Sequence, residues 1–526
     1  MGWVVSAAMI QSGALLWLPP LLLAAWVVAK ALNALWWRPR QLERMLRAQG
    51  LAGTPYRFLF GDLKEMGRLM EEAESKPMPP LSHDIGPRVA AFLTRKTKEL
   101  GGGTSFTWLG PVPRVTLMEP ELVKEVLVKK FDQIGRPDLG PYGHLLTTGV
   151  FSYHGEKWAK HRKILNPAFH LEKLKGMLPA MLACCSEMIE KWESKLGPEG
   201  SSEIDIWPDF QGLSADVISH TAFGSSYKEG KRIFLLQSEQ AELLLLSLQS
   251  IYIPGFRFLP TPKNNRRKAI YREVQSILRG IIKKREEAIK MGEPPKQDLL
   301  GLLLESTLNH SRESGDKKGG MTTDEMIEEC KLFFFAGQET TSILLTMALI
   351  TLSMHPDWQE RAREEVMQAF GKNKPEFEEL GRLKIVTMIL YEVLRLYPSV
   401  PILERTTNKP VQIGNLSIPA GVGLSLPAVF FHNDRKYWGK DAGEFNPERF
   451  AEGVSKASKD QFAFFPFGGG PRVCIGQNYS LLEAKMALGM ILQRFSFELS
   501  PSYSHAPTAV FTLQPQHGAP LKFRRL

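Results

Sequence analysis

The chain has 526 residues, of which 43% are hydrophobic and 23% charged, and its formal net charge at pH 7 is +10. This balance is typical of a globular protein and excludes a disordered chain or a membrane protein with many spans. The positive charge suits nucleic acid, an anionic membrane or an acidic protein. The basic residues are scattered and match no nucleic-acid-binding signature, so we expect no nucleic-acid partner.

The cysteines indicate a reducing compartment. They form no spaced disulfide framework and no CxxC pair, which argues against zinc or iron–sulfur binding. They are Cys184, Cys185, Cys330 and Cys474.

The N-terminal segment predicts one membrane-spanning helix. No charged side chain occurs before Lys30, and residues 14–29 read ALLWLPPLLLAAWVVA, close to the about 20 apolar residues that a span needs. Pro19 and Pro20 predict an irregularity in this helix. The alternative is a cleaved signal peptide, but such peptides carry their positive charges before the apolar run, whereas here the arginines follow it.

The order of residues around position 37 predicts the orientation and the domain organisation. Trp36 and Trp37 are typical of a membrane interface, and the arginines after them place the rest of the chain in the cytosol. We therefore expect a membrane anchor over 1–37, a basic, Pro/Gly-rich hinge over 38–66 and one body over 67–526.

The body is predicted to be mainly α with a minor β-sheet. Apolar residues recur every three or four positions over most of 120–400, as in the segments 121–131, 171–196 and 271–291. Strand-like pieces occur at 104–110, 114–119 and 509–515.

A long helix is predicted over residues 321–358. Thr322 and Glu325 fit a capping box, so the helix should begin there. Pro356 should end it near His355.

The middle of this helix, AGQETT (336–341), is unusual. Gly337 costs about 1 kcal/mol relative to alanine, and Ala336, Gly337 and Thr340 share one helix face. Two interpretations stay open. The face is a helix–helix contact through small residues, or it is a groove for a small ligand in which Thr340 and Glu339 pass protons.

The stretch FPFGGGPRVCIG (465–476) places a cysteine in a glycine-rich loop before a helical run over 477–495. Glycines let the backbone approach a flat object closely, and a helix N-terminus favours a thiolate at Cys474. A thiolate is a strong axial ligand for haem iron, and Arg472 could pair with a haem propionate. A buried cysteine in a glycine-rich turn is the alternative.

These stretches together resemble the cytochrome P-450 monooxygenases. FGGGPRVCIG (467–476) matches the family's FxxGxRxCxG signature at Phe467, Gly470, Arg472, Cys474 and Gly476. AGQETT resembles the family's oxygen-binding helix, in which Glu339 and Thr340 are the acid–alcohol pair. Three further matches occur in the family's order: ExxR at Glu392 and Arg395, the PERF-like meander with Arg449, and WxxxR at Trp158 and Arg162.

The resemblance covers roughly residues 50–526. Within the family, the chain is most similar to the plant microsomal group that includes secologanin synthase and triterpenoid oxidases. It implies a cytochrome P-450 fold, haem b ligated by Cys474, and Trp158, Arg162 and Arg472 at the propionates. Arg405 is a further candidate there, and a solvated arginine is its alternative. Glu392, Arg395 and Arg449 would form a buried, structural charge cluster.

The implied reaction is insertion of one atom of O2 into a lipophilic, terpenoid-type molecule. No dinucleotide fingerprint follows a strand, so electrons would come from another protein. The resemblance implies NADPH–cytochrome P-450 reductase as that protein, with cytochrome b5 as a further partner. Reductase contacts would be Lys157, Lys160, Lys163 and Lys485, which an ordinary solvated face explains as well. Substrate contacts would lie in 141–151, 240–258 and 399–403, on the face near Phe334 and Ala336, and near Phe511. Core packing explains these residues equally well.

The resemblance also implies the endoplasmic reticulum membrane, with a single span and the catalytic body facing the cytosol. Two other functions stay open. A haem-thiolate isomerase or dehydratase would act without O2, but such enzymes typically lack the acid–alcohol pair that is intact here at Glu339 and Thr340. A non-catalytic haem-binding protein would need neither Thr340 nor a reductase surface.

Overall fold

The computed structural model describes residues 19–79, 82–224, 227–248, 255–294, 298–313 and 320–526. Residues 1–18 of the expected anchor and residues 249–254 of one expected substrate segment lie outside this part of the chain. The described residues confirm a mainly α fold with small sheets.

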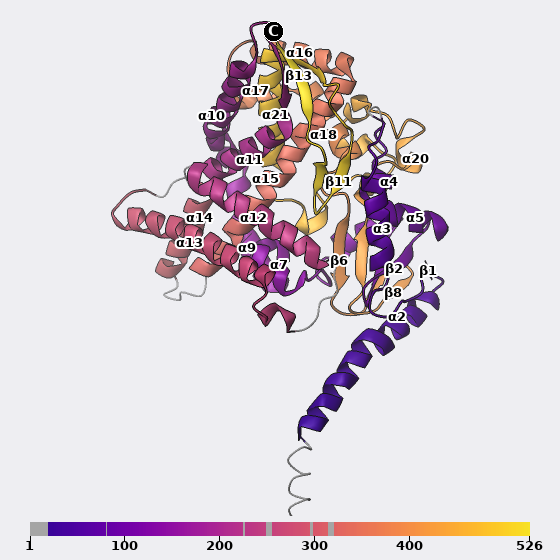
Figure 1. Cartoon of the computed structure of the whole chain (residues 1–526). Helices are drawn as coiled ribbons and strands as arrows, with labels where there is room; N and C mark the ends of the chain where they lie inside the picture. The colour runs from indigo at the N-terminus through magenta and orange to yellow at the C-terminus, as the bar shows by residue number, and fades with distance from the viewer. Residues whose placement is uncertain (1–18, 80–81, 225–226, 249–254, 295–297, 314–319) are drawn as a thin grey trace, which may run out of the picture.

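One helix extends away from the body (Figure 1). It runs from Pro19 to Arg47, includes the π-helical turn η1 (Asn33–Trp37) and ends as α2 (Arg38–Arg47). No residue of its most apolar 18-residue window is buried, and the helix is long and apolar enough to cross a membrane. By contrast, Leu42 and Leu46 of α2 are buried in the core of the body.

The expected boundaries at residues 37 and 67 both fall inside helices. Residue 37 is the last residue of η1, within the helix that starts at Pro19, and residue 67 lies in α3 (Leu63–Glu74). Between them, β1 (Ala52–Gly53) pairs with β2 (Ser105–Leu109) in the main sheet. The Pro/Gly-rich segment is thus held against the body on both sides.

The body is organised around the buried helix α15 (Thr323–Met354). The capping box is formed, because Thr322 accepts from the Glu325 backbone and Glu325 accepts from the Thr322 backbone, and the helix ends at Met354. Both predicted ends are therefore confirmed. Helices packed along α15 include α11 (Ile206–Phe223), α13 (Pro262–Lys290), α18 (Lys384–Leu396) and α21 (Gln477–Arg494).

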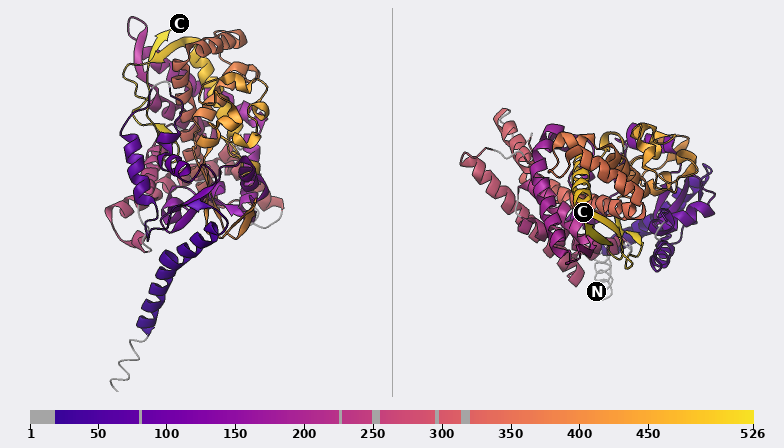
Figure 2. Two further views of the ribbon diagram at one scale, coloured as in Figure 1. Left: turned by 90° about the vertical axis from the view of Figure 1, so that its right-hand side faces the viewer. Right: turned by 90° about the horizontal axis from the view of Figure 1, so that it is seen from above.

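The remaining helices wrap this centre (Figures 1 and 2). In the first half they are α4 (Gly86–Val89), α5 (Ala91–Glu99), α6 (Pro120–Lys124), η2 (Glu125–Lys129), α7 (Gly140–Leu146), α8 (Gly149–Ser152), α9 (Gly155–Leu165), η3 (Asn166–Phe169) and α10 (Leu171–Lys195). Further along they are α12 (Tyr227–Leu248), η4 (Phe256–Phe258), α14 (Leu299–Glu313), α16 (Pro356–Phe370), α17 (Phe377–Arg382), α19 (Ala428–Phe431), α20 (Arg435–Trp438), η5 (Pro447–Phe450), η6 (Val454–Lys456), η7 (Gln461–Ala463) and η8 (Gly470–Arg472).

The main sheet has six strands in the order β1-β2-β3-β9-β6-β4. Its members beyond β1 and β2 are β3 (Val112–Thr116), β4 (Ile134–Gly135), β6 (Leu403–Thr407) and β9 (Gly423–Leu426). The smaller sheets join β10 (Phe495–Leu499), β13 (Pro520–Arg525) and β5 (Ser201–Asp205), then β11 (Pro507–Ala509) with β12 (Leu513–Pro515), and β7 (Val411–Ile413) with β8 (Leu416–Ile418). The segment 509–515, expected as one strand, contains the turn between β11 and β12.

Candidate functional site

The cysteine loop, residues 467–476, contains η8 and leads into α21. A hydrogen bond between two of its backbone groups closes it. The Cys474 N–H donates to the Phe467 carbonyl at 2.9 Å, and the Gly476 N–H bonds the thiol. Gly470 has a φ of +66°, and a Cβ there would lie 2.1 Å from the carbonyl oxygen of Leu127 in η2. Only glycine therefore lets the loop rest directly on the η2 backbone.

Open space borders both Cys474 and Ala336, although each belongs to a segment packed into the body. Cys474 keeps accessible surface, and Ala336 is exposed in the middle of the otherwise buried helix α15. Protein atoms enclose the thiol on its other sides, so burial raises the pKa of Cys474, while the Gly476 N–H and the charges of Arg162 and Arg136 lower it.

Arginines gather around this thiol, and no carboxylate among the described residues forms an ion pair with them. The pKa of Arg136 is held well below its usual value by burial and by the positive charges of Arg405 and Arg472. Burial and like charge also lower the pKa values of Arg405 and Arg472, each to about 10. In the described part of the chain, the Nε atoms of Arg136 and Arg472 are buried without a hydrogen-bond partner.

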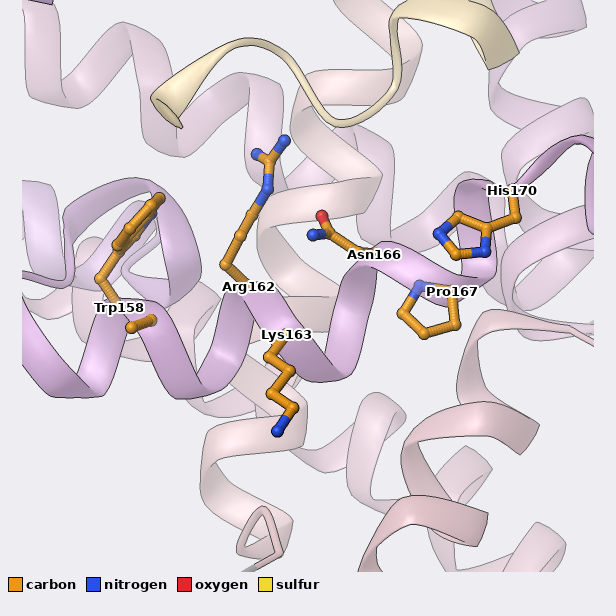
Figure 3. Close-up of a pocket in the computed structure, with 7 residues that line it drawn as sticks. Trp158, Arg162, Lys163, Asn166, Pro167 and His170 are labelled. Carbon is orange, nitrogen blue, oxygen red and sulfur yellow. The ribbon is translucent and has the colours of Figure 1, made fainter. Parts of the chain in front are cut away.

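The helix α9 supplies a further arginine and an indole. Arg162 extends from α9 toward the pale yellow cysteine loop, whereas Lys163 points the other way (Figure 3). The guanidinium of Arg472 lies over the Trp158 ring, 4.6 Å from its centroid. Trp158 and Arg162 line a cavity of about 410 Å³ together with Ala159, Lys163, Asn166, Pro167 and His170.

Thr340 and Glu339 are neighbours in α15, but their side chains contact different elements. The Thr340 hydroxyl donates to the Ala336 carbonyl at 2.8 Å. The Glu339 carboxyl accepts from Thr512 at 3.2 Å and from Gln514 at 3.1 Å, both in or beside β12. Burial raises the pKa of Glu339. The structure therefore does not join the two groups by a hydrogen bond.

Glu392, Arg395 and Arg449 come together in the core. Arg395 donates to both oxygens of Glu392 at 2.8 and 2.7 Å, and both side chains are fully buried. Arg449 lies 3.5 Å from the same carboxylate. Arg395 also donates to the carbonyls of His432 and Ala442, so the pair ties α18 to the segment that precedes the cysteine loop.

The sequence interpretation missed Arg136. No motif marks it, because it follows only a two-residue strand. The pairing of β4 with β6 sets Gly135 opposite Thr406, which brings Arg136 beside Arg405. Only this pairing between distant segments reveals its place in the arginine cluster.

The residues present fit haem. Four buried or half-buried arginines have no carboxylate partner within the described ranges, and they need an anionic group because uncompensated charge inside a protein is costly. Two propionates supply such charge, and a thiol held in a glycine-rich loop fits a metal ligand beside them. The donor set thus suits a flat, dianionic, metal-containing group.

A second apolar cluster lies apart from the main core. It consists of Tyr142 and Leu146 of α7 with Ala241 and Leu244 of α12, and Leu139, Leu145, Leu248, Phe335 and Phe511 pack against it. Three of the five regions expected to contact substrate meet here, namely 141–151, 240–258 and Phe511, and Phe335 adjoins a fourth, the face near Phe334 and Ala336. Tyr142 donates to the side chain of Asn264 at 3.0 Å.

Comparisons with known proteins agree with this geometry. The family model described as Cytochrome P450 matches residues 90–522. The chain is 60% identical to Cytochrome P450 CYP72A616 of Paris polyphylla over 96% of this chain and 97% of that protein. It is 55% identical to Cytochrome P450 72A397 of Kalopanax septemlobus over 94% and 95% of the two chains. It is 51% identical to Secologanin synthase 1 of Catharanthus roseus over 96% of each.

Proposed function

The chain belongs to the cytochrome P450 family and is a haem-thiolate monooxygenase, and we propose that it oxidises a lipophilic, terpenoid-type molecule with electrons from NADPH through a reductase. The observation that carries the site assignment is the group of arginines without counter-ions around Cys474. The substrate class rests on similarity to a relative named for secologanin and on the apolar cluster of α7 and α12.

The first proposed roles are those of the thiolate ligand and of the residues that pair with the haem propionates. Bound haem supplies the activation of O2 and the transfer of one oxygen atom to the substrate. Cys474 would bind it as a thiolate, a form favoured by the Gly476 N–H and by the charge of Arg162 and Arg136. Trp158, Arg405 and Arg472, with these two arginines, would hold the propionates through charge-assisted hydrogen bonds.

Ala336, Gly337 and Thr340 would provide a small, hydroxyl-bearing face of α15 at the haem site. A Cβ on Gly337 would lie 3.1 Å from Ile218, so glycine lets α11 approach α15 closely. The Thr340 hydroxyl would hold a proton for the reaction at its Oγ1 atom. Glu339 keeps its own proton more readily because burial raises its pKa, and it would reach Thr340 only by leaving Thr512 and Gln514.

The proposed reductase surface is narrower than the four lysines expected from the sequence. Lys157 pairs with Glu325 at 3.0 Å, Lys160 donates to the Gly320 carbonyl at 2.7 Å, and burial lowers the pKa of Lys485. Lys163 is exposed at the 410 Å³ cavity beside Arg162. We therefore assign the contact with an acidic reductase surface to this edge of α9. Cytochrome b5 is proposed to share it.

The apolar helix at Pro19–Arg47 supports a single-pass anchor. We propose the endoplasmic reticulum membrane with the body in the cytosol, where the reductase is anchored in the same bilayer. The arginines after Trp37 support this orientation.

The carbon-monoxide difference spectrum of the reduced protein tests the site. We expect a band near 450 nm in the native protein and its loss in Cys474→Ser, which keeps the side-chain size but removes the thiolate. A native band near 420 nm would contradict thiolate ligation. NADPH oxidation with reductase and a terpenoid panel then tests the substrate class, and consumption of NADPH and O2 separates monooxygenation from isomerisation.

A further inference from the structure

Glu329 of α15 is a fully buried carboxylate that neither the motifs nor the proposed mechanism uses. Its side chain has no exposed surface. Each oxygen has a different donor: Oε1 accepts from Nδ1 of His161 at 2.7 Å, and Oε2 accepts from the Val150 N–H at 3.0 Å. These donors belong to α9 and α8, so one carboxylate joins three helices.

On one side Glu329 holds the loop that follows α7. Gly149 has a φ of +58°, and a Cβ there would lie 2.7 Å from Oε2 of Glu329, so the loop backbone packs directly on the carboxylate. The neighbouring Glu328 holds the same loop, because it accepts from the Thr148 hydroxyl at 2.7 Å. This loop continues α7, whose Tyr142 and Leu146 form the apolar cluster of the proposed substrate side.

On the other side Glu329 holds the helix that faces the haem propionates. His161 is fully buried and precedes Arg162, which lines the cavity with Trp158 one turn earlier. The Tyr153 ring packs edge-on against His161, with centroids 4.7 Å apart, and the Tyr153 carbonyl accepts from Arg472 at 2.7 Å. The contact therefore leads to two of the proposed propionate arginines.

We infer that Glu329 is a positioning residue that couples the substrate-side loop to the haem-binding helix α9. One rigid carboxylate with one donor from each segment fixes both positions at once. A ligand that presses on α7 then acts on α9 through Glu329, and by linkage the grip on haem acts on the loop. Glu328 contacts the loop but not α9, and within α15 it pairs with Lys331 at 3.0 Å. It therefore serves as the control for the contact with α9. The substrate-side assignment rests on the proposed function.

The test uses the full-length, haem-loaded protein and two readouts. Haem transfer to excess apomyoglobin reports on α9, and the Kd for clotrimazole, a bulky azole, reports on the substrate side, with imidazole as a small ligand that does not reach α7. We expect Glu329→Gln to speed haem transfer and to raise the clotrimazole Kd, each at least fivefold. Glu328→Gln should raise the clotrimazole Kd but leave haem transfer within twofold of native.

A second pair of variants keeps the test decisive if Glu329→Gln does not fold. Asparagine places its amide where histidine has Nδ1, so His161→Asn should keep native haem transfer, whereas His161→Phe should speed it at least fivefold. The inference is overturned if Glu328→Gln speeds haem transfer as much as Glu329→Gln, or if the two His161 variants behave alike. Absence of clotrimazole binding to the native protein would contradict the proposed substrate side alone, since the haem-transfer readout does not depend on it.

Discussion

At the scale of single residues, the site is defined by charges that the protein leaves uncompensated. Arg136 shows this most clearly, because its Nε is buried without a partner in the described part of the chain and its neighbours Arg405 and Arg472 repel it. We expect such a residue to lower the stability of the haem-free protein and to strengthen the binding of haem.

Arg136→Leu is therefore expected to shift two measurements in opposite directions. Removing a buried, unpaired charge should raise the free energy of unfolding of the haem-free protein by about 1–3 kcal/mol. Haem transfer to apomyoglobin should become faster by at least tenfold, because a propionate partner is lost. Urea unfolding and transfer kinetics provide the two values. A loss of stability in the haem-free protein would mean that Arg136 is satisfied without haem.

The sequence predicts residues whose role is written in local spacing. Cys474, Arg472 and Gly470 follow one another in a single loop, and Trp158 and Arg162 are one helical turn apart. Arg136 and Glu329 lack such a signal, because the groups that surround them lie on segments distant in the chain. Neither spacing nor composition can show where a buried charge finds its partner. The separation of Glu339 from Thr340 likewise depends on β12, which no helix pattern predicts.

At the scale of elements, a buried chain of histidines and tyrosines joins helix ends to the C-terminal segment. His83 contacts the Tyr397 hydroxyl at 2.7 Å and His355 at 3.2 Å. Tyr397 lies 3.4 Å from His505, which contacts Tyr503 at 2.7 Å. Burial, with the nearby charges of His355, His505 and Arg395, lowers the pKa of His83 to about 3. Burial lowers the pKa of His505 to about 4, and Arg88 also lowers it.

These histidines predict loss of stability on acidification. In the unfolded chain His83 and His505 bind protons below pH 6.5, whereas in the folded chain they bind protons only near pH 3–4. The free energy of unfolding should therefore fall by up to about 1.4 kcal/mol per pH unit for each histidine between pH 6.5 and 4. Urea titrations at pH 7, 6 and 5 measure this slope. His83→Asn should flatten it, while His144→Asn, an exposed control, should not. An unchanged slope in His83→Asn would contradict the prediction.

Elements with strong local signals were predicted well. The capping box of α15, the helix α10 and the strands β2 and β3 all agree with the sequence pattern. The region 121–131 is helical, but as α6 followed by the π-helical η2, and the cysteine loop rests on the η2 backbone at Leu127. Hydrophobic periodicity does not distinguish an α-helix from such a locally widened turn.

At the scale of the whole molecule, the boundary between anchor and body can be tested by truncation. Removing residues 1–37 should move the protein to the soluble fraction and keep its 450 nm band. Removing residues 1–48 also removes Leu42 and Leu46, which pack in the core. That second truncation should lower the free energy of unfolding by about 3–6 kcal/mol relative to the first. Equal stability of the two truncations would place α2 outside the body.

The unbroken helix from Pro19 to Arg47 has a geometric consequence. Its exposed apolar part and its docked end, with Leu42 and Leu46 in the core, belong to one rod. An α-helix turns by about 100° and rises by about 1.5 Å with each residue. One residue inserted into this helix on the N-terminal side of its docked end would rotate the body by roughly a quarter turn around the helix axis. The number of residues in this helix thus sets which face of the body is directed toward the bilayer.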